Sequence, residues 1–259
     1  MPGPIDTVKA QSEATGRIVD SLSDADFAKD APGCPGWKVN NVVMHLTVGA
    51  QLFAGSAAGD KSIWERRDEH VKAVAGAAPA EMKRHHADAN RQFIASLESL
   101  SPAELQSKTA THPAVGEIPL LRLAGMRVSE ATIHSWDIES ARNPHAKLEG
   151  PGVPMTLEAI SGGWPMWFLP EQISGISRTY RLVGGSFDRR LTIGEGKASW
   201  AEGPGQADIT LTMDAGDLAL LIAGRLSADK LISAGRAKVE GDPVAARTFS
   251  TLFRAYGGR

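Results

Sequence analysis

The sequence contains a single cysteine, Cys34, in a chain of 259 residues. A disulfide within the chain is therefore impossible, which excludes the small secreted domains that disulfides hold together. One unpaired cysteine fits a reducing compartment, and the polar first residues, MPGPIDTVKAQSEATG, do not resemble a signal peptide. We therefore expect a cytoplasmic protein.

Long hydrophobic runs and an excess of one charge are also missing. No apolar run approaches the roughly 18 residues of a membrane-spanning helix. Lys and Arg number 28 against 30 Asp and Glu, a formal charge of −2 that offers no basic surface to nucleic acid. We expect no membrane or nucleic-acid partner, and a chain that acts as a monomer on small molecules.

What is present is the composition of a globular protein, with 42% hydrophobic and 22% charged residues. A chain of this length forms one large domain or two ordinary ones. Its character changes near residue 145, where long helical periodicities give way to short, strand-like segments. The sequence therefore predicts a domain over 1–148 and a second over 149–259.

The first part favours four helices with mostly polar connections, which is typical of a four-helix bundle. Their predicted ranges are 5–22, 38–54, 80–100 and 119–141. Pro119 suits the first turn of the last helix, because its missing N–H would be unpaired there anyway. The connection at 101–118 is long and shows no clear strand, so we expect it to carry function or a short helix.

The second part mixes short strands with helices and Gly-containing turns, so the fold class is α+β, with strands first and helices last. The predicted strands are 178–185, 188–193, 197–201, 207–213 and 237–242. The predicted helices are 214–224, which ends at a glycine, and 243–256, which begins with a proline.

Glu130 and His134 lie four residues apart in the segment RVSEATIHSWD, within the last predicted helix of the bundle. At about 100° per residue their side chains point in directions roughly 40° apart, so they share one helix face with Asp137. Such a pair can bind one divalent ion, but a catalytic site needs a third protein ligand. His45 is the best candidate, because it lies among apolar neighbours in VVMHLTV, where a histidine needs a partner.

The ordinary interpretation of these residues is that no metal binds. A Glu–His pair at this spacing is more often a polar pair on a helix surface. A lone histidine in an apolar helix is more often hydrogen-bonded in a core than bound to a metal. Spacing and composition alone therefore leave both interpretations open and favour the ordinary one.

Two separated motifs resemble the mycothiol-dependent maleylpyruvate isomerase family of the DinB-like superfamily. They are CPGWKVNNVVMHL, which begins at Cys34, and the later R-x-x-E-x-x-x-H-x-W-D, which begins at Arg127. The segments DAGDLALLIAGRL and RAKVEGDPVAARTF resemble the second domain of the same family, which is similar to sterol-carrier modules. The resemblance covers nearly the whole chain and implies a DinB-like bundle followed by a smaller α+β sterol-carrier-like domain.

This resemblance implies a role for four residues, and the helix geometry adds Asp137. Glu130 is expected as a ligand, with an acid/base group beside the metal as its alternative. His45, Glu130 and His134 match the ligands of a divalent metal, of which zinc is the expected one, although His₂Glu suits other ions too. Arg225 matches an arginine of the second domain that reaches the active site. An arginine there would bind a carboxylate through two hydrogen bonds, or else it is an exposed residue at a helix end. Asp137 either orients a ligand histidine or is an exposed acid near the end of its helix.

The implied cosubstrate is mycothiol, a low-molecular-weight thiol. Metal ligation stabilises the thiolate, which is the nucleophile. A thiolate that adds to an electrophilic double bond permits rotation, and its expulsion completes a cis–trans isomerisation. The same activation serves an S-transferase. The sequence names neither the substrate nor the reaction. The alternative is a non-catalytic carrier of small molecules or lipids, with a structural or vestigial metal site.

Several other residues have simpler expectations. Cys34 is a small turn residue in preference to a nucleophile, because no base is adjacent to it in the sequence. Trp37 is a packing anchor where the second helix begins. His85 and His86 point about 100° apart, and we expect them on a solvated helix. No role is assigned to His112.

Overall fold

The computed structural model describes residues 3–163 and 167–254. The chain divides into two compact units. The first unit comprises 1–146 and 150–155, and the second comprises 147–149 and 156–259. Among the described residues, no helix is long and apolar enough to cross a membrane.

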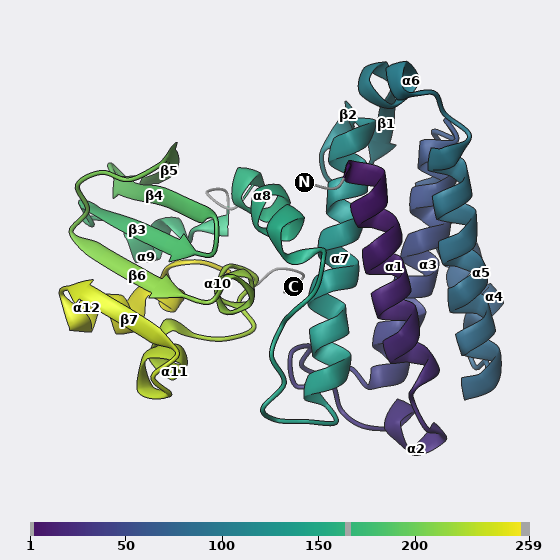
Figure 1. The fold of residues 1–259 in the computed structure, drawn as a ribbon, viewed down its shortest axis with the longest axis horizontal. Helices are drawn as coiled ribbons and strands as arrows, with labels where there is room; N and C mark the ends of the chain where they lie inside the picture. The colour runs from purple at the N-terminus through teal and green to yellow at the C-terminus, as the bar shows by residue number, and fades with distance from the viewer. Residues whose placement is uncertain (1–2, 164–166, 255–259) are drawn as a thin grey trace. The chain divides into compact units, whose positions relative to one another are not determined.

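Four long helices run side by side in the first unit (Figure 1). They are α1 (Pro4–Asp20), α3 (Val39–Ala57), α5 (Pro79–Glu98) and α7 (Leu120–Ser140). Helix α7 packs against α1 and α3, and α5 packs against the same two helices. Each helix therefore has two neighbours, which is the arrangement of a four-helix bundle. This confirms the predicted bundle.

Short elements join the long helices of the bundle. They are α2 (Asp24–Phe27), a 3₁₀ turn labelled η1 (Ile63–Arg66) and α4 (Arg67–Val74). Pro79 occupies the first turn of α5, where its missing N–H costs nothing. Pro119 does not do the same in α7, because the helix begins one residue later, at Leu120.

The connection between α5 and α7 contains more structure than the sequence indicates. It forms α6 (Pro102–Ser107) and an antiparallel hairpin of β1 (Thr109–His112) and β2 (Gly116–Pro119). The strands were not expected because each is only four residues long and neither alternates apolar and polar side chains clearly. The predicted short helix is present as α6.

The second unit is built on a five-stranded sheet in the order β5-β4-β3-β6-β7. Its strands are β3 (Arg178–Gly184), β4 (Phe187–Gly194), β5 (Lys197–Glu202), β6 (Ile209–Met213) and β7 (Ala237–Gly241). β3 and β6 are parallel, and the other neighbours are antiparallel. Buried residues alternate with more exposed ones along β3 and β6, so one face of the sheet carries the core.

Helices supply the rest of this core. They are α8 (Val153–Gly163), α9 (Pro170–Ile173), α10 (Ala215–Ile222), α11 (Ala228–Ser233), α12 (Pro243–Thr248) and the 3₁₀ turn η3 (Phe249–Leu252). The described part confirms the α+β class. The expected helix at 243–256 is wrong in its length, because α12 ends at Thr248 and Phe253 is extended and pairs with Phe168. The last expected positions, from residue 255, lie outside the described residues.

The segment that follows α7 belongs alternately to the two units. Within the first unit, the Gly152 N–H donates to Gln11 Oε1 at 3.0 Å, and a Cβ at Gly152 would overlap the Thr132 hydroxyl. Within the second unit, a Cβ at Gly216 would overlap the carbonyl oxygen of Leu148. Glycine is needed at both positions because the backbone comes this close to its neighbours.

Candidate metal centre

Helices α3 and α7 bring three sequence-predicted residues together. His45 lies on α3, and Glu130 and His134 lie one turn apart on α7. His45 Nε2 is 2.8 Å from Glu130 Oε2, and His134 Nε2 is 3.4 Å from the same oxygen. One ligand atom from each residue lies within 4.8 Å of the other two. The three residues can therefore face a single ion.

The donor set fits a divalent metal. Two imidazoles and one carboxylate are ligands that zinc and several other divalent ions accept. Ligand atoms about 2.0–2.1 Å from a tetrahedral zinc lie roughly 3.3 Å from each other. The 3.4 Å between His134 Nε2 and Glu130 Oε2 matches this separation, and the shorter His45 contact is an ordinary hydrogen bond. Small side-chain movements would accommodate the ion.

Solvent reaches this cluster from the side of His45. The exposed fraction of the side chain is 37% for His45, 18% for Glu130, 7% for His134 and 0% for Asp137. A catalytic metal needs an open position beside its protein ligands. The accessible edge of the cluster is at His45, whereas its Asp137 side is closed.

The closed side holds a second group of candidate ligands, Cys34, His134 and Asp137. Asp137 Oδ2 accepts a hydrogen bond from His134 Nδ1 at 2.8 Å and another from Cys34 Sγ at 3.2 Å. A neutral imidazole has one nitrogen free to bind a metal, and the hydrogen bond made by the other nitrogen decides which one it is. Because Asp137 occupies Nδ1, Nε2 is left to face His45 and Glu130. Asp137 and Cys34 are therefore placed to orient His134.

The turn before α3 positions Cys34 for this contact. Backbone N–H groups at Cys34 and Trp37 donate to the carbonyls of Ala31 and Cys34, each at 2.9 Å, and Gly36 adopts a φ of +85°. Gly33 lies so close to Asp137 that a Cβ there would overlap the carboxylate. Cys34 is thus the turn residue that the sequence indicates, but its thiol also contacts Asp137.

Trp37 has the predicted packing role and also contacts the two histidines of the site. It packs against the apolar core of the bundle. Its ring also stacks on His134, with centroids 6.3 Å apart and planes 14° apart, and its centroid is 5.4 Å from that of His45. The indole therefore limits the movement of both imidazoles.

The electrostatics of the cluster favour a bound cation. Burial by itself would raise the pKa of Glu130, but hydrogen bonds from His134 and His45 outweigh burial and hold that pKa well below its usual value. Burial would lower the pKa of His134, but Asp137, Cys34 and Glu130 together raise that pKa well above its usual value. The carboxylates thus stabilise positive charge at this cluster, and a bound metal ion would supply such charge.

Arg225 belongs to the second unit, where it follows α10. Its Nη1 donates to the Ala223 carbonyl at 3.3 Å. This is the contact with helix-terminal carbonyls that the sequence offers as the ordinary alternative for Arg225. Its role toward the metal cluster, which lies in the first unit, stays a prediction.

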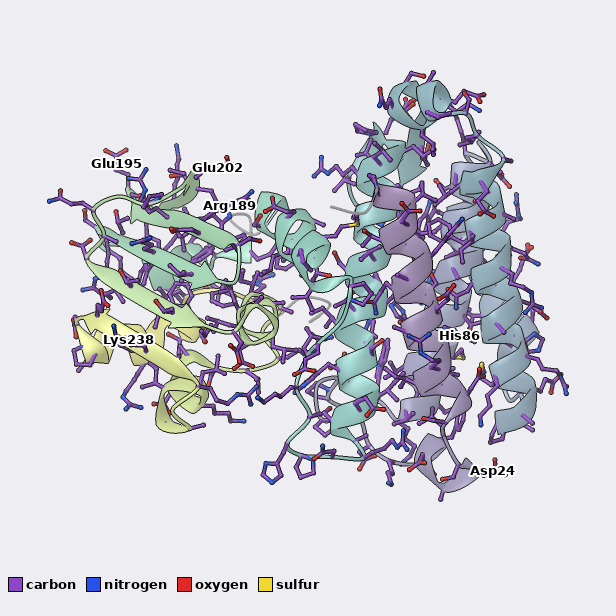
Figure 2. The ribbon with its side chains drawn as sticks, in the orientation of Figure 1. Asp24, His86, Arg189, Glu195, Glu202 and Lys238 are labelled. Carbon is purple, nitrogen blue, oxygen red and sulfur yellow. The ribbon has the colours of Figure 1, made fainter. Side chains whose placement is uncertain are left out.

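One buried polar network in the bundle was not expected from the sequence. It consists of Arg127 on α7 with His86 and Asn90 on α5, and all three are buried. His86 projects from α5 into the interior of the bundle, whereas Asp24 lies exposed on α2 (Figure 2). The expectation of a solvated His86 is wrong, although His85 is partly exposed and approaches Glu81 at 3.6 Å.

The sequence did contain a signal for the burial of His86. Its spacing to Met82, Ala89 and Phe93 is four, three and seven residues, so it lies on the apolar stripe of α5, and these three residues are buried. The sequence assigns no role to His112. Its ring packs 4.9 Å from that of Trp64, and burial lowers its pKa.

Comparison with protein families gives two matches along the chain. Residues 8–139 match the family described as the mycothiol maleylpyruvate isomerase N-terminal domain. Residues 182–254 match the SCP-2 sterol transfer family. The first match spans half of the chain and contains all three candidate ligands, and the second contains Arg225.

Solved structures with a similar fold include two of the mycothiol-dependent maleylpyruvate isomerase. A histidine-to-alanine mutant of that enzyme aligns with a TM-score of 0.60 and 13% identity, over 92% of this chain and 91% of the other. The second structure aligns with a TM-score of 0.58 and 14% identity, over 86% of this chain and 88% of the other. At this identity the likeness shows the fold alone. A search of curated protein sequences finds no match.

Proposed function

The chain belongs to the mycothiol maleylpyruvate isomerase family, and on that premise we propose that it is a metal- and thiol-dependent enzyme. In this proposal His45, Glu130 and His134 hold a divalent ion, zinc in the first instance. The cosubstrate is a low-molecular-weight thiol, mycothiol, and the second substrate is a small electrophile. The reaction is an isomerisation or an S-transfer.

The observation that carries this proposal is the convergence of three ligand atoms at an accessible edge of the bundle. The ligands come from two helices, and His134 is held from behind by Asp137. A metal-binding histidine usually donates the N–H of its second ring nitrogen to a carboxylate, which fixes the orientation of the ring. A structural metal site is usually closed, whereas this cluster is accessible at His45, as a catalytic site requires.

The bound ion would supply one kind of chemistry, the stabilisation of a thiolate at neutral pH. Glu130 and the two histidines would fix its position, and Asp137 would keep the Nε2 of His134 directed at it. Trp37, stacked on His134, would exclude water from that side. Arg225 would bind a carboxylate of the substrate or the thiol through its planar guanidinium.

Both candidate reactions use the same nucleophile. In an isomerisation, the thiolate sulfur forms a bond to one carbon of a conjugated double bond, and the electron pair moves into the adjacent carbonyl. Rotation about the new single bond follows, and return of the pair expels the thiolate unchanged. In an S-transfer, the carbon–sulfur bond persists, and an epoxide oxygen or a halide takes the electron pair instead.

Metal analysis followed by a thiol-consumption screen tests the proposal. Purified protein should contain about one divalent ion per chain, as expected for one three-ligand site. It should then consume mycothiol in the presence of an electrophile, or isomerise a cis double bond with catalytic mycothiol, only when the metal is bound. Thiol consumption that persists after chelation and dialysis would refute the metal-dependent mechanism.

The match of residues 182–254 to the SCP-2 sterol transfer family favours a second candidate, a carrier of an apolar ligand. A carrier would bind a fluorescent fatty acid or sterol with the same affinity before and after metal removal. It would show no metal-dependent thiol consumption with any electrophile. That pair of results would replace the enzyme with the carrier.

A further inference from the structure

The buried network of Arg127, Asn90 and His86 lies beside the candidate metal centre. Arg127 precedes Glu130 by three residues on α7, so the two side chains occupy neighbouring positions on that helix. On the opposite side, a Cβ at Gly49 would be 3.5 Å from Arg127 Nη1. Gly49 follows His45 by one turn of α3. The guanidinium therefore lies one helical turn from two of the three candidate ligands.

The hydrogen bonds of the network fix its charge. Arg127 Nη2 donates to Asn90 Oδ1 at 3.1 Å, because a guanidinium has no acceptor. The amide of Asn90 must then turn its NH₂ toward His86, where it lies 2.9 Å from Nε2. His86 Nε2 accepts, so His86 is neutral and carries its proton on Nδ1. Arg127 is the only charged member of the network.

This arrangement leaves the arginine charge without a carboxylate partner inside the network. Among the described residues, Arg127 Nε and His86 Nδ1 have no hydrogen-bond partner. Burial lowers the pKa of Arg127 to about 10, and the carboxylate that opposes this shift is Glu130. Arg127 thus remains protonated at neutral pH. Burial of a guanidinium without a carboxylate partner lowers the stability of the folded protein, and an apolar residue of similar size would lower it less.

We propose that Arg127 is a positioning residue that supplies a fixed positive charge to the metal centre, so that the centre binds its thiol as an anion. The inference rests on the proposed function. With a divalent ion and two ionised carboxylates, Glu130 and Asp137, the cluster is neutral. Adding a thiolate makes it negative, and Arg127 restores neutrality. Asn90 and His86 hold the guanidinium in place without neutralising it.

The size of the effect follows from Coulomb's law. Two unit charges about 6–8 Å apart, at an effective dielectric constant of about 20, change a binding constant by about 30- to 100-fold. The sign depends on the ligand. Loss of Arg127 should weaken the binding of an anionic thiolate, but it should not weaken the binding of a cation. A residue that only supports the fold would weaken both.

The test compares Arg127→Gln and Arg127→Lys with wild type and with Arg142→Gln as control. Arg142 lies just beyond the end of α7, where it bonds Ser21 and Glu139 near the surface. Its loss changes the net charge equally, about 22 Å along the helix axis from Arg127. Zinc affinity is measured by chelator competition. Mycothiol affinity is measured on the zinc-loaded protein by calorimetry.

We expect Arg127→Gln to raise the mycothiol Kd by about 30- to 100-fold while its zinc affinity stays equal to or above that of wild type. Arg127→Lys, which keeps the charge, should stay within several-fold of wild type, and Arg142→Gln should change neither constant. Parallel loss of zinc and mycothiol affinity in Arg127→Gln, or an unchanged mycothiol Kd, would overturn the inference.

A second variant keeps the inference testable if Arg127→Gln does not fold. Asn90→Asp combined with His86→Gln retains the arginine and places a carboxylate against it. Because the glutamine cannot take up a proton as His86 would, this carboxylate cancels the arginine charge. It should weaken mycothiol binding in the same direction, and strong mycothiol binding in this variant would contradict the role of the charge. A wild-type protein that binds no zinc fails differently, because that result refutes the proposed metal centre itself.

Discussion

In the first unit, buried polar side chains follow α7 and the helices that face it, whereas in the second unit the core is almost entirely apolar. Among the described residues, the second unit buries only Thr156, Ser161 and Asp217 as polar side chains. Asp217 is paired with Arg236 through two hydrogen bonds. The first unit buries an arginine, two histidines and two aspartates, among others.

This difference shows that the first unit buries polar and charged groups that reduce its stability, whereas the second unit largely does not. Polar groups in a core cost free energy unless they are hydrogen-bonded, and charges cost more. The second unit largely avoids this cost, and its ion pairs, such as Arg181 with Asp188, are partly exposed. The bundle accepts the cost along α7, which is the helix that carries Glu130 and His134. The comparison therefore supports the proposed placement of the chemistry in the bundle, and the following experiments test it.

The largest expected effect is the loss of metal from ligand variants of the bundle. His45→Ala and His134→Ala should each lower metal affinity by more than the roughly 10- to 100-fold that follows removal of an outer-shell partner. His85→Ala is the matched control, because His85 is partly exposed on α5 and approaches Glu81, which is not a candidate ligand. Mass-spectrometric metal analysis after dialysis measures the occupancy. Full occupancy in both ligand variants would rule out this site.

The next effect concerns the contribution of the second unit. Arg225→Ala should lower kcat/KM by about 1.5–3 kcal/mol of transition-state stabilisation, the scale of a charge-assisted hydrogen bond. Arg225→Lys should restore little, since an ammonium cannot make the two-pronged contact. Metal content should not change. Arg247→Ala serves as control, because Arg247 is an exposed arginine bonded to Asp229 and Ser233. Equal losses in both alanine variants would remove the special role of Arg225.

A smaller effect should follow when the support of His134 is disturbed. Asp137→Asn should lower metal affinity by about 10- to 100-fold, because the amide is a poorer acceptor for the imidazole N–H. Gly33→Ala tests the same support without changing a ligand, because its Cβ would displace the Asp137 carboxylate. Gly16→Ala is the control, since a Cβ there meets nothing. Wild-type metal affinity in both Asp137→Asn and Gly33→Ala would show that Asp137 does not orient the ligand.

The smallest predicted effect is a pH-dependent loss of stability at His86. Burial and the charge of Arg127 lower the pKa of His86 to about 3, below its usual 6.5. The unfolded chain therefore binds more protons between these values, and stability is lost as the pH falls below 6.5. At pH 5.5 this loss is about 1.4 kcal/mol.

The His86→Gln variant isolates this contribution, because the glutamine oxygen can accept the Asn90 N–H but does not titrate. Urea-dependent hydrogen exchange of α5 reports on the first unit at pH 5.5 and 7.5. The wild type should lose about 1.4 kcal/mol more than the variant over this interval. Identical losses would show that His86 is protonated in the folded protein or already exposed.

How far the sequence predicts the molecule depends on the range of the interactions. The four bundle helices and the strands of the second unit follow from local periodicity, and their bounds agree to within a few residues. The pairing of His45 with Glu130 was predicted because two motifs resemble one family. The contact of Cys34 with Asp137 was not, because the two residues are 103 positions apart and only the turn at 31–37 brings them together.

Short elements and buried polar groups mark the limit of local patterns. The hairpin of β1 and β2 has too few residues for an alternation to be read. His86 lies on the apolar stripe of α5, but its polar identity pointed to solvent. Its direct partner, Asn90, is four positions along α5, and Asn90 in turn accepts from Arg127, which is 41 positions from His86 on another helix. A polar residue on the apolar stripe of a helix is thus better interpreted as a buried residue within a hydrogen-bond network than as a surface residue.

The segment from 147 to 155 limits how the two units can be exchanged by recombination. It enters the second unit at 147–149, returns to the first at 150–155, and then leaves it again. A break before Lys147 deprives the bundle of the glycine that packs on Gln11. A break after Met155 removes Leu148 from its place over Gly216. No single crossover in the gene therefore exchanges one intact unit, because the boundaries between the units fall after residues 146, 149 and 155.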